Sequence, residues 1–248
     1  MLKYEIIKRM KTLRESLLDD DLVEKTDKSI KDEIKAFLKT NYNGSVKISR
    51  KPNTDGKYEV SSTKDVEVIR KNITSLTNGM FIWTTVNGSF EVLYCDSLKS
   101  LDGAPKEVGR KFNCSICTSL KSLEGAPKEV GGSFCCSSCD SLTSLKGAPE
   151  KVGGNFYCDY NKSLKSLEGA PKKVGGTFDC SGCKSLESLK GAPKEVGGSF
   201  NCAGGLSLKS LEYAPEKVEG NFCCSNCAGK FTIEDVKKIS NVKGKIIC

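Results

Sequence analysis

A short internal repeat constrains the fold of this chain more than any other feature. Six units of equal length follow one another from Ser97 to Ala228 without insertion or deletion. The first reads SLKSLDGAPKEVGRKFNCSICT and the fifth SLESLKGAPKEVGGSFNCAGGL. A unit of this length cannot bury its apolar side chains alone, so successive units must stack in register. The sequence therefore predicts an elongated solenoid over residues 97–228.

Each unit contains one clear strand signal. Phe112 and Cys114 stand two residues apart, and every later unit repeats this spacing. Period-two alternation predicts a short strand whose Phe and Cys side chains face the core. The constant leucines, such as Leu120 and Leu123, supply the other wall of that core. Gly-Ala-Pro turns the chain, and Gly-Gly lets the backbone bend before the strand.

The string F-x-C-S-x-C-x-S-L-x-S-L resembles the leucine-rich repeat, and GAP stands where short bacterial repeats of that family carry a proline-bearing turn. The resemblance implies an α+β, leucine-rich-repeat-like β-solenoid of 22-residue coils. It also implies a ladder of Asn or Cys side chains that satisfy the backbone at the bend after each strand. The ladder maps onto Cys117, Cys139, Asn161, Cys183 and Cys227, whereas Gly205 leaves one position empty.

The strings SLTNG, GAPKEVGG and VKGKIIC are also similar to repeat proteins of gut phages and their bacterial hosts. This second resemblance covers nearly the whole chain and implies no known activity. It suggests a phage-encoded protein that acts on a host or virion protein in the bacterial cytosol.

The regions beside the repeats predict caps. Residues 1–43 are expected to form two amphipathic helices, which either cover the first coil or bind a partner. The first helix groups Ile6, Met10, Leu13 and Leu17; the second, N-capped by Thr26, groups Ile30, Ile34, Phe37 and Leu38. Residues 44–96 are expected to form irregular coils, and residues 229–248 a helix, N-capped by Thr232, with a closing strand ending at Ile246 and Cys248.

The 14 cysteines raise the question of a metal site, because Cys114, Cys117, Cys136 and Cys139 have the spacing of a four-cysteine zinc site. The same spacing follows from the 22-residue period, and Val92 fills the inward slot in the preceding imperfect coil. Free cysteine packs as a small hydrophobe. Core packing is therefore the preferred interpretation, with zinc binding as an alternative, and no cofactor is expected.

Composition narrows the function further. The chain contains no histidine, which removes the commonest general base and every Cys/His zinc site. A net charge of +8, from 39 basic and 31 acidic residues interleaved along the chain, does not favour nucleic acid. No apolar run approaches the roughly 18 residues of a membrane helix, and the N-terminus does not resemble a secretory signal. A cytoplasmic protein with reduced thiols is expected.

The outward strand slot varies where the inward slots repeat: it holds Glu91, Asn113, Cys135, Tyr157, Asp179, Asn201 and Cys223. Such variation is typical of a binding face or of drift at exposed positions. The candidate binding residues are Lys111, Asn113, Asn155, Tyr157, Asp159, Tyr160 and Asp179, with the two tyrosines as anchors. Cys135 and Cys223 are the candidate reactive thiols.

The function expected from these features is non-enzymatic binding of a protein partner whose identity the sequence leaves open. A structural, self-assembling role is the alternative, and a zinc protein built on the C-x2-C pairs is a third possibility. The oligomeric state is left open.

Overall fold

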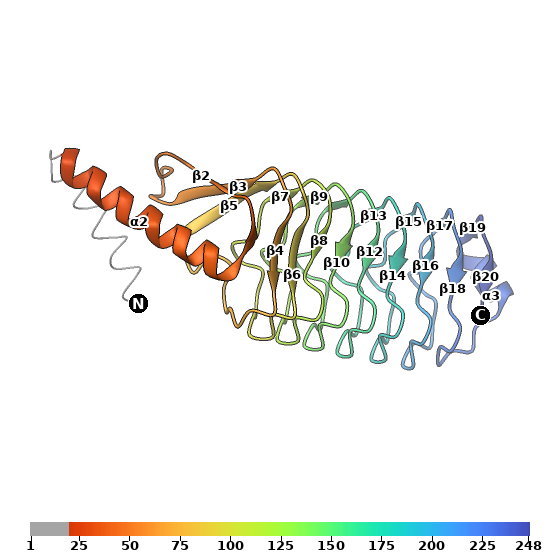
Figure 1. The fold of residues 1–248 in the computed structure, drawn as a ribbon. Coiled ribbons are helices and arrows are strands. Elements are labelled where there is room, and N and C mark those ends of the chain that lie inside the picture. Colours follow the sequence, from red (N-terminus) through yellow and green to blue (C-terminus); the bar gives the residue numbers. More distant parts are fainter. Residues whose placement is uncertain (1–19) are drawn as a thin grey trace.

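The computed structural model describes residues 20–248, with side chains from residue 27 onward. The chain winds into a rod of stacked coils, with α2 (Asp20–Asn41) at one end and α3 (Ile233–Ile239) at the other (Figure 1). The predicted β-solenoid of 22-residue coils is therefore confirmed. The expected first helix, with Ile6, Met10, Leu13 and Leu17, lies outside the described residues.

One sheet of ten strands carries the Phe positions, and we call it the Phe sheet. All its neighbouring strands are parallel except β1, which pairs antiparallel with β4. Its strands, in spatial order, are β1 (Asn43–Gly44), β4 (Val66–Ile69), β6 (Phe90–Leu93), β8 (Phe112–Asn113), β10 (Phe134–Cys135), β12 (Phe156–Tyr157), β14 (Phe178–Asp179), β16 (Phe200–Asn201), β18 (Phe222–Cys223) and β20 (Ile246–Ile247).

A second ten-stranded sheet, the Val sheet, forms on the other side of each coil. It too is parallel, except that β2 pairs antiparallel with β3. Its strands, in spatial order from the N-terminal end, are β2 (Lys47–Ile48), β3 (Tyr58–Ser62), β5 (Phe81–Val86), β7 (Glu107–Val108), β9 (Glu129–Val130), β11 (Lys151–Val152), β13 (Lys173–Val174), β15 (Glu195–Val196), β17 (Lys217–Val218) and β19 (Asn241–Val242).

The Phe side chains form a continuous stack along the axis of the rod. Register places Phe134 beside Phe112 and Phe156, and Phe156 beside Phe178. The ring centroids of Phe156 and Phe178 are 5.1 Å apart, with an angle of 3° between the rings. Every Phe from Phe90 to Phe222 in this stack is fully buried, as are the inward Cys114 and Cys158. The predicted core positions are confirmed.

The sequence did not predict the Val sheet. Each two-residue strand from β7 to β17 presents one buried residue, such as Val130 or Val174, next to an exposed charged residue. The buried Val faces the leucines and the Phe stack within one cluster. Each coil thus has two strand sides, and the leucines lie between them in the core.

One described helix lies at each end of the rod (Figure 1), and the prediction for the N-terminal one needs a correction. Thr26 lies inside α2 and is therefore not its N-cap. Ile34 and Leu38 are buried against the first coils, as the amphipathic pattern predicted. At the other end, Thr232 begins α3 with a capping box, in which its side chain and that of Asp235 exchange bonds with each other's backbone N–H. No helix within residues 20–248 is long and apolar enough to cross a membrane.

Candidate functional site

The outward positions of the Phe sheet form one row, because parallel strands pair residues that are one coil apart. Asn113 pairs with Cys135, Cys135 with Tyr157, and Tyr157 with Asp179. Exposure along the row is uneven: Asn113 and Cys135 are buried, whereas Tyr157 and Asp179 are half-buried. The structure thus brings the candidate binding residues together on one face.

The position before each Phe has a structural role that the sequence did not reveal. In successive coils its side-chain oxygen accepts the backbone N–H of the same position one coil further on. The Ser133 hydroxyl accepts from Asn155 at 3.1 Å, and the Asn155 carbonyl accepts from Thr177 at 2.8 Å. Ser199 and Asn221 continue the series. From Ser133 to Asn221 the residues at this position vary, but each is a short side chain with an oxygen acceptor, so Asn155 is held by the coil stack.

Other candidate residues are also engaged within the solenoid. Asp179 accepts from the backbone of Ser181 at 2.9 Å and from the Asn201 amide at 3.3 Å. Asp159 accepts from the Ser137 hydroxyl at 2.5 Å. Lys111 forms an ion pair with Glu91 at 3.0 Å. Ser181 belongs to the same coil as Asp179, whereas the other partners come from adjacent coils, and together they hold the face in a fixed conformation.

Two tyrosines of one coil lie on the accessible part of this face. Tyr157 is half-buried, and its hydroxyl accepts from the Asn155 amide at 2.8 Å. Tyr160 is 60% exposed and has a left-handed backbone with φ of 56°. The same position one and two coils further on is Gly182 and Gly204, also left-handed. The Tyr160 ring lies close to Gly182, since a Cβ added there would meet its Cδ1 at 2.6 Å.

The prediction that Cys135 is a reactive thiol is wrong. Cys135 is 8% exposed, and its burial raises the pKa of the thiol to about 11. It lies between longer side chains of the adjacent coils, with Lys111 and Asp159 near enough to influence its charge. Cys223 is half-buried, and Cys248 is the exposed cysteine of the described chain. Cys135 is therefore a poor nucleophile at neutral pH.

The predicted ladder after the strand is present and explains the second cysteine of each pair. Cys139 donates its thiol hydrogen to the carbonyl of Cys114 at 3.2 Å, and Cys183 donates to that of Cys158 at 3.2 Å. Asn161 donates to the carbonyls of Cys136 and Cys158.

The ladder thiols of Cys139 and Cys183 are protonated donors at neutral pH, because burial raises the pKa of each to about 12. Over residues 20–248 we find no group of three or more His, Cys, Asp or Glu side chains arranged to hold a metal ion. Zinc binding thus remains a prediction from the spacing alone.

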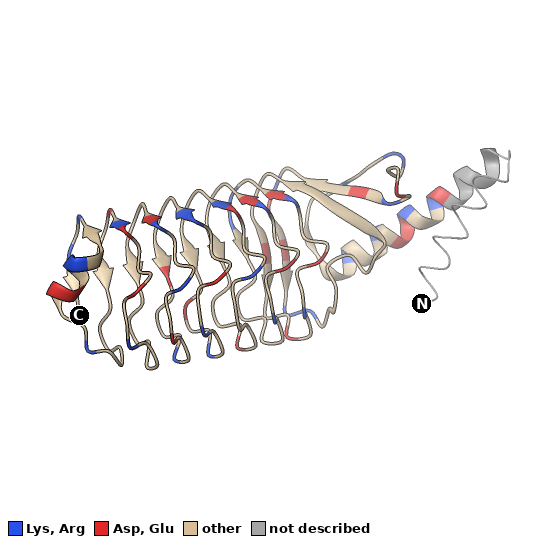
Figure 2. Cartoon of the chain, turned by 180° about the vertical axis from the view of Figure 1, so that it is seen from behind, with Lys and Arg blue, Asp and Glu red and all other residues tan. Residues whose placement is uncertain are grey.

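Charged residues pair between neighbouring coils. Lys146 contacts Glu124 at 2.9 Å, and Lys190 contacts Glu168 at 2.7 Å, both at one loop position that alternates in sign. Figure 2 shows acidic and basic residues interleaved along the rod. These exposed pairs each add little to stability. Their arrangement avoids the repulsion that would follow from stacking identical charges.

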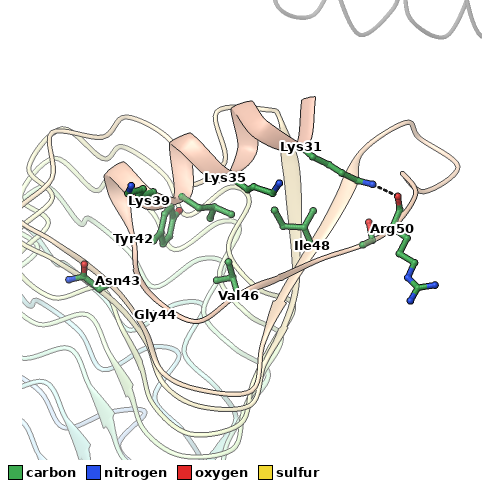
Figure 3. A pocket seen from close by; sticks show the side chains of 11 residues that line it. Lys31, Lys35, Lys39, Tyr42, Asn43, Gly44, Val46, Ile48 and Arg50 are labelled. Atoms are coloured by element: carbon green, nitrogen blue, oxygen red, sulfur yellow. Dashed lines mark hydrogen bonds between the residues drawn. The ribbon is translucent and has the colours of Figure 1, made fainter. Parts of the chain in front are cut away.

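The N-terminal end contains a groove that was not predicted from the sequence. A groove of about 700 Å³ lies between α2 and the segment that carries β1 and β2 (Figure 3). Lys31, Lys35 and Lys39 line it from the helix, and Arg50 lies at its far side. The spacing of four between the lysines places them on one helix face and was the signal that could have revealed the groove.

Comparison of the chain with protein-family models, with curated proteins and with solved structures gave no match. The likeness to leucine-rich repeats and to phage repeat proteins therefore stays a resemblance of sequence. What the structure defines is the architectural class, a two-sheet parallel β-solenoid.

Proposed function

We propose that the chain is a non-enzymatic binding protein that contacts a protein partner through the outward face of the Phe sheet. The observation that carries this proposal is Tyr160, an exposed aromatic side chain at a position that needs none. Gly182 and Gly204 fill the same left-handed position in the next coils without disturbing the stack. Exposed aromatic residues on a rigid surface are typical anchors of protein interfaces.

The surroundings of Tyr160 support this use. Tyr157 lies in the same coil and is held by Asn155, while Gly182 and Gly204 leave the surface low beside the Tyr160 ring. A fixed aromatic pair next to a low surface needs little ordering when a partner binds, which favours affinity. By resemblance to phage repeat proteins, we propose that the partner is a host or virion protein in the bacterial cytosol.

The test uses substitutions that the repeat itself contains. Tyr157→Asn copies Asn113 and Asn201, and Tyr160→Gly copies Gly182. The double variant should fold as the parent does but lose a partner captured from a lysate of the producing cells. Affinity should fall by about 2 kcal/mol or more, as for aromatic hot spots.

The control variant carries Lys106→Glu and Lys172→Glu on the loops before the Val sheet. Glu150 and Glu216 already occupy that position in other coils. The control should retain the partner. If the parent and the tyrosine double variant capture the partner equally, this face has no role in binding. If the parent captures no partner, the proposed binding function is contradicted.

Self-assembly is the second candidate, and the C-terminal end of the rod favours it. β20 and β19 are the last strands of the two sheets, and Ile247 on β20 is 45% exposed. Open strand edges are templates for pairing with another chain. Light scattering after size exclusion should then show an oligomer that Ile247→Lys converts to a monomer. A monomeric parent protein would contradict this alternative.

A further inference from the structure

The groove at the N-terminal end has two apolar walls. Leu38 and Tyr42 border it from the helix side, and Val46 and Ile48 from the strand side (Figure 3). Its volume of about 700 Å³ falls within the range of ligand pockets, about 300–1,000 Å³. One end is closed by Lys31, whose ammonium group donates to the backbone carbonyl of Arg50. The groove is thus a defined recess with an apolar lining.

The strand side of the groove is the free edge of a sheet. β2 is the terminal strand of the Val sheet and pairs with β3 through Lys47 and Ile48. Ser49 donates its backbone N–H toward β3, to Glu59 at 2.9 Å. Backbone groups of successive residues alternate in direction, so those of Ile48 and Arg50 point away from β3. The bond from Lys31 to the Arg50 carbonyl agrees with this direction.

The rim of the groove is basic. Lys31, Lys35 and Lys39 project from one face of α2, and Arg50 lies opposite. Among the described residues that line the groove, none is acidic. Lys35 has an ion pair with Asp32 at 2.9 Å, but its side chain remains 64% exposed and able to meet a second carboxylate. The groove therefore attracts negative charge.

We propose that this groove binds an acidic, extended peptide segment of a partner protein. The segment adds a strand to the free edge of β2, seats alternate apolar side chains between the walls, and presents carboxylates to Lys35 and Lys39. Strand addition takes its affinity from main-chain hydrogen bonds and its specificity from side-chain contacts. This site lies at the end of the rod and is separate from the tyrosine face.

Two other occupants fit the groove less well. Residues 1–19 of this chain contain more basic than acidic residues, so their charge does not complement the lysines. Single-stranded nucleic acid binds through exposed aromatic rings on which bases stack. Tyr42, the aromatic residue of the groove, is buried and donates its hydroxyl to the Leu76 carbonyl. An extended acidic peptide complements all three features of the groove: the free strand edge of β2, the apolar walls and the basic rim.

The test is fluorescence anisotropy with a labelled probe peptide of sequence Glu-Val-Glu-Leu-Glu-Val-Glu at low salt. We expect saturable binding that Lys35→Glu with Lys39→Glu weakens about tenfold or more, because charge reversal converts attraction to repulsion. Lys106→Glu with Lys172→Glu changes the net charge equally at distant exposed sites and should change affinity less than twofold. If the reversed variant unfolds, Lys35→Gln with Lys39→Gln gives the same comparison.

Two further probes distinguish strand addition from attraction by charge alone, and peptide binding from nucleic-acid binding. A peptide N-methylated at alternate residues keeps its charge but cannot pair along an edge, and it should bind at least tenfold more weakly. A thymidine octanucleotide should bind more weakly than the peptide. Absence of saturable peptide binding, equal binding by the reversed variant, or tighter binding of the oligonucleotide would overturn the proposal. Equal affinity of the methylated peptide would overturn strand addition.

The tyrosine double variant distinguishes the two binding surfaces. Because Tyr157 and Tyr160 are remote from α2 along the rod, their replacement should leave peptide affinity within twofold of the parent. A loss there would mean that the peptide binds the Phe sheet face, which would overturn the groove as its site.

Discussion

Asn161 shows what the bend after each Phe strand requires of a side chain. It donates to the carbonyls of Cys136 and Cys158, at 3.0 and 2.8 Å, and accepts from the backbone N–H of Cys139 at 2.7 Å. A cysteine at this position supplies one donor, as Cys183 does toward Cys158. Asn and Cys are interchangeable here because both place a hydrogen-bond donor against a buried carbonyl.

This predicts a graded response at position 161. Asn161→Ala should destabilise the protein by about 2–4 kcal/mol, because it leaves buried backbone groups without partners. Asn161→Cys should recover part of that loss, since it restores one donor. Urea unfolding followed by circular dichroism measures both. If the two variants are equally stable, the hydrogen bonds of the ladder do not matter to stability.

Alkylation tests the assignment of the thiols. Brief treatment of the native protein with iodoacetamide should label Cys248 first and Cys223 next, because these are the exposed and half-buried cysteines. Cys135 should react slowly, because burial raises the pKa of its thiol to about 11. Peptide mass spectrometry gives the order. Labelling of Cys135 as fast as Cys248 would show that the outward row is more open than the structure indicates.

At the scale of the element, each coil is held mainly by its neighbours through the Phe stack. Phe156 lies between Phe134 and Phe178, with ring centroids 5.3 and 5.1 Å away. The strands themselves are short, and β12 contains Phe156 and Tyr157 alone. Packing between coils, rather than strand length, therefore sets their stability.

Phe156→Ala should accordingly lower the free energy of unfolding by about 3–5 kcal/mol, because it leaves a cavity in the middle of the stack. Hydrogen exchange should show lost protection in the adjacent coils as well. Cys158→Val is the matched control and should be mild, since Val92 fills that slot in an earlier coil and is fully buried. Unfolding by Cys158→Val but not by Cys158→Ser would refute the packing role of the inward thiols.

The inward residues of the Phe sheet could be predicted because the same residue types recur in every unit of the repeat. The Val sheet could not, because a single buried Val130 beside the exposed Glu129 carries no period-two signal. The strand register shows that the outward positions form one row, but the sequence did not predict that Asn113 and Cys135 are buried in it. Cys135 is small and lies between longer neighbours, and that depends on packing between coils rather than on the residue itself.

At the scale of the whole molecule, the many buried thiols should make the folded protein less stable at alkaline pH. Burial raises the pKa of Cys139 and Cys183 to about 12 in the native state. In the unfolded chain a thiol ionises with a pKa of about 8.5. The native state therefore keeps protons that the unfolded state loses above that pH. Stability contributed by these thiols is complete below about pH 8.5 and is lost as the pH rises toward 12.

The melting temperature should thus fall between pH 8 and pH 10, with a single thiol such as Cys139 accounting for about 2 kcal/mol at pH 10. Cys139→Asn removes one titrating group and places there the residue that Asn161 provides one coil later. Thermal unfolding at both pH values should show a smaller decrease for this variant. An unchanged pH dependence would mean that the thiol pKa is not shifted by folding.

The uniform register of the coils means that the number of units sets the distance between the two ends of the rod. Each unit pairs with the next through equivalent positions, as Phe134 does with Phe156, so one unit can be removed without changing the pairing pattern of the others. Deleting or duplicating one whole unit shifts the distance between the N-terminal groove and the C-terminal end by one strand spacing, about 4.8 Å. The span of this molecule can therefore change in fixed steps while both of its ends stay the same.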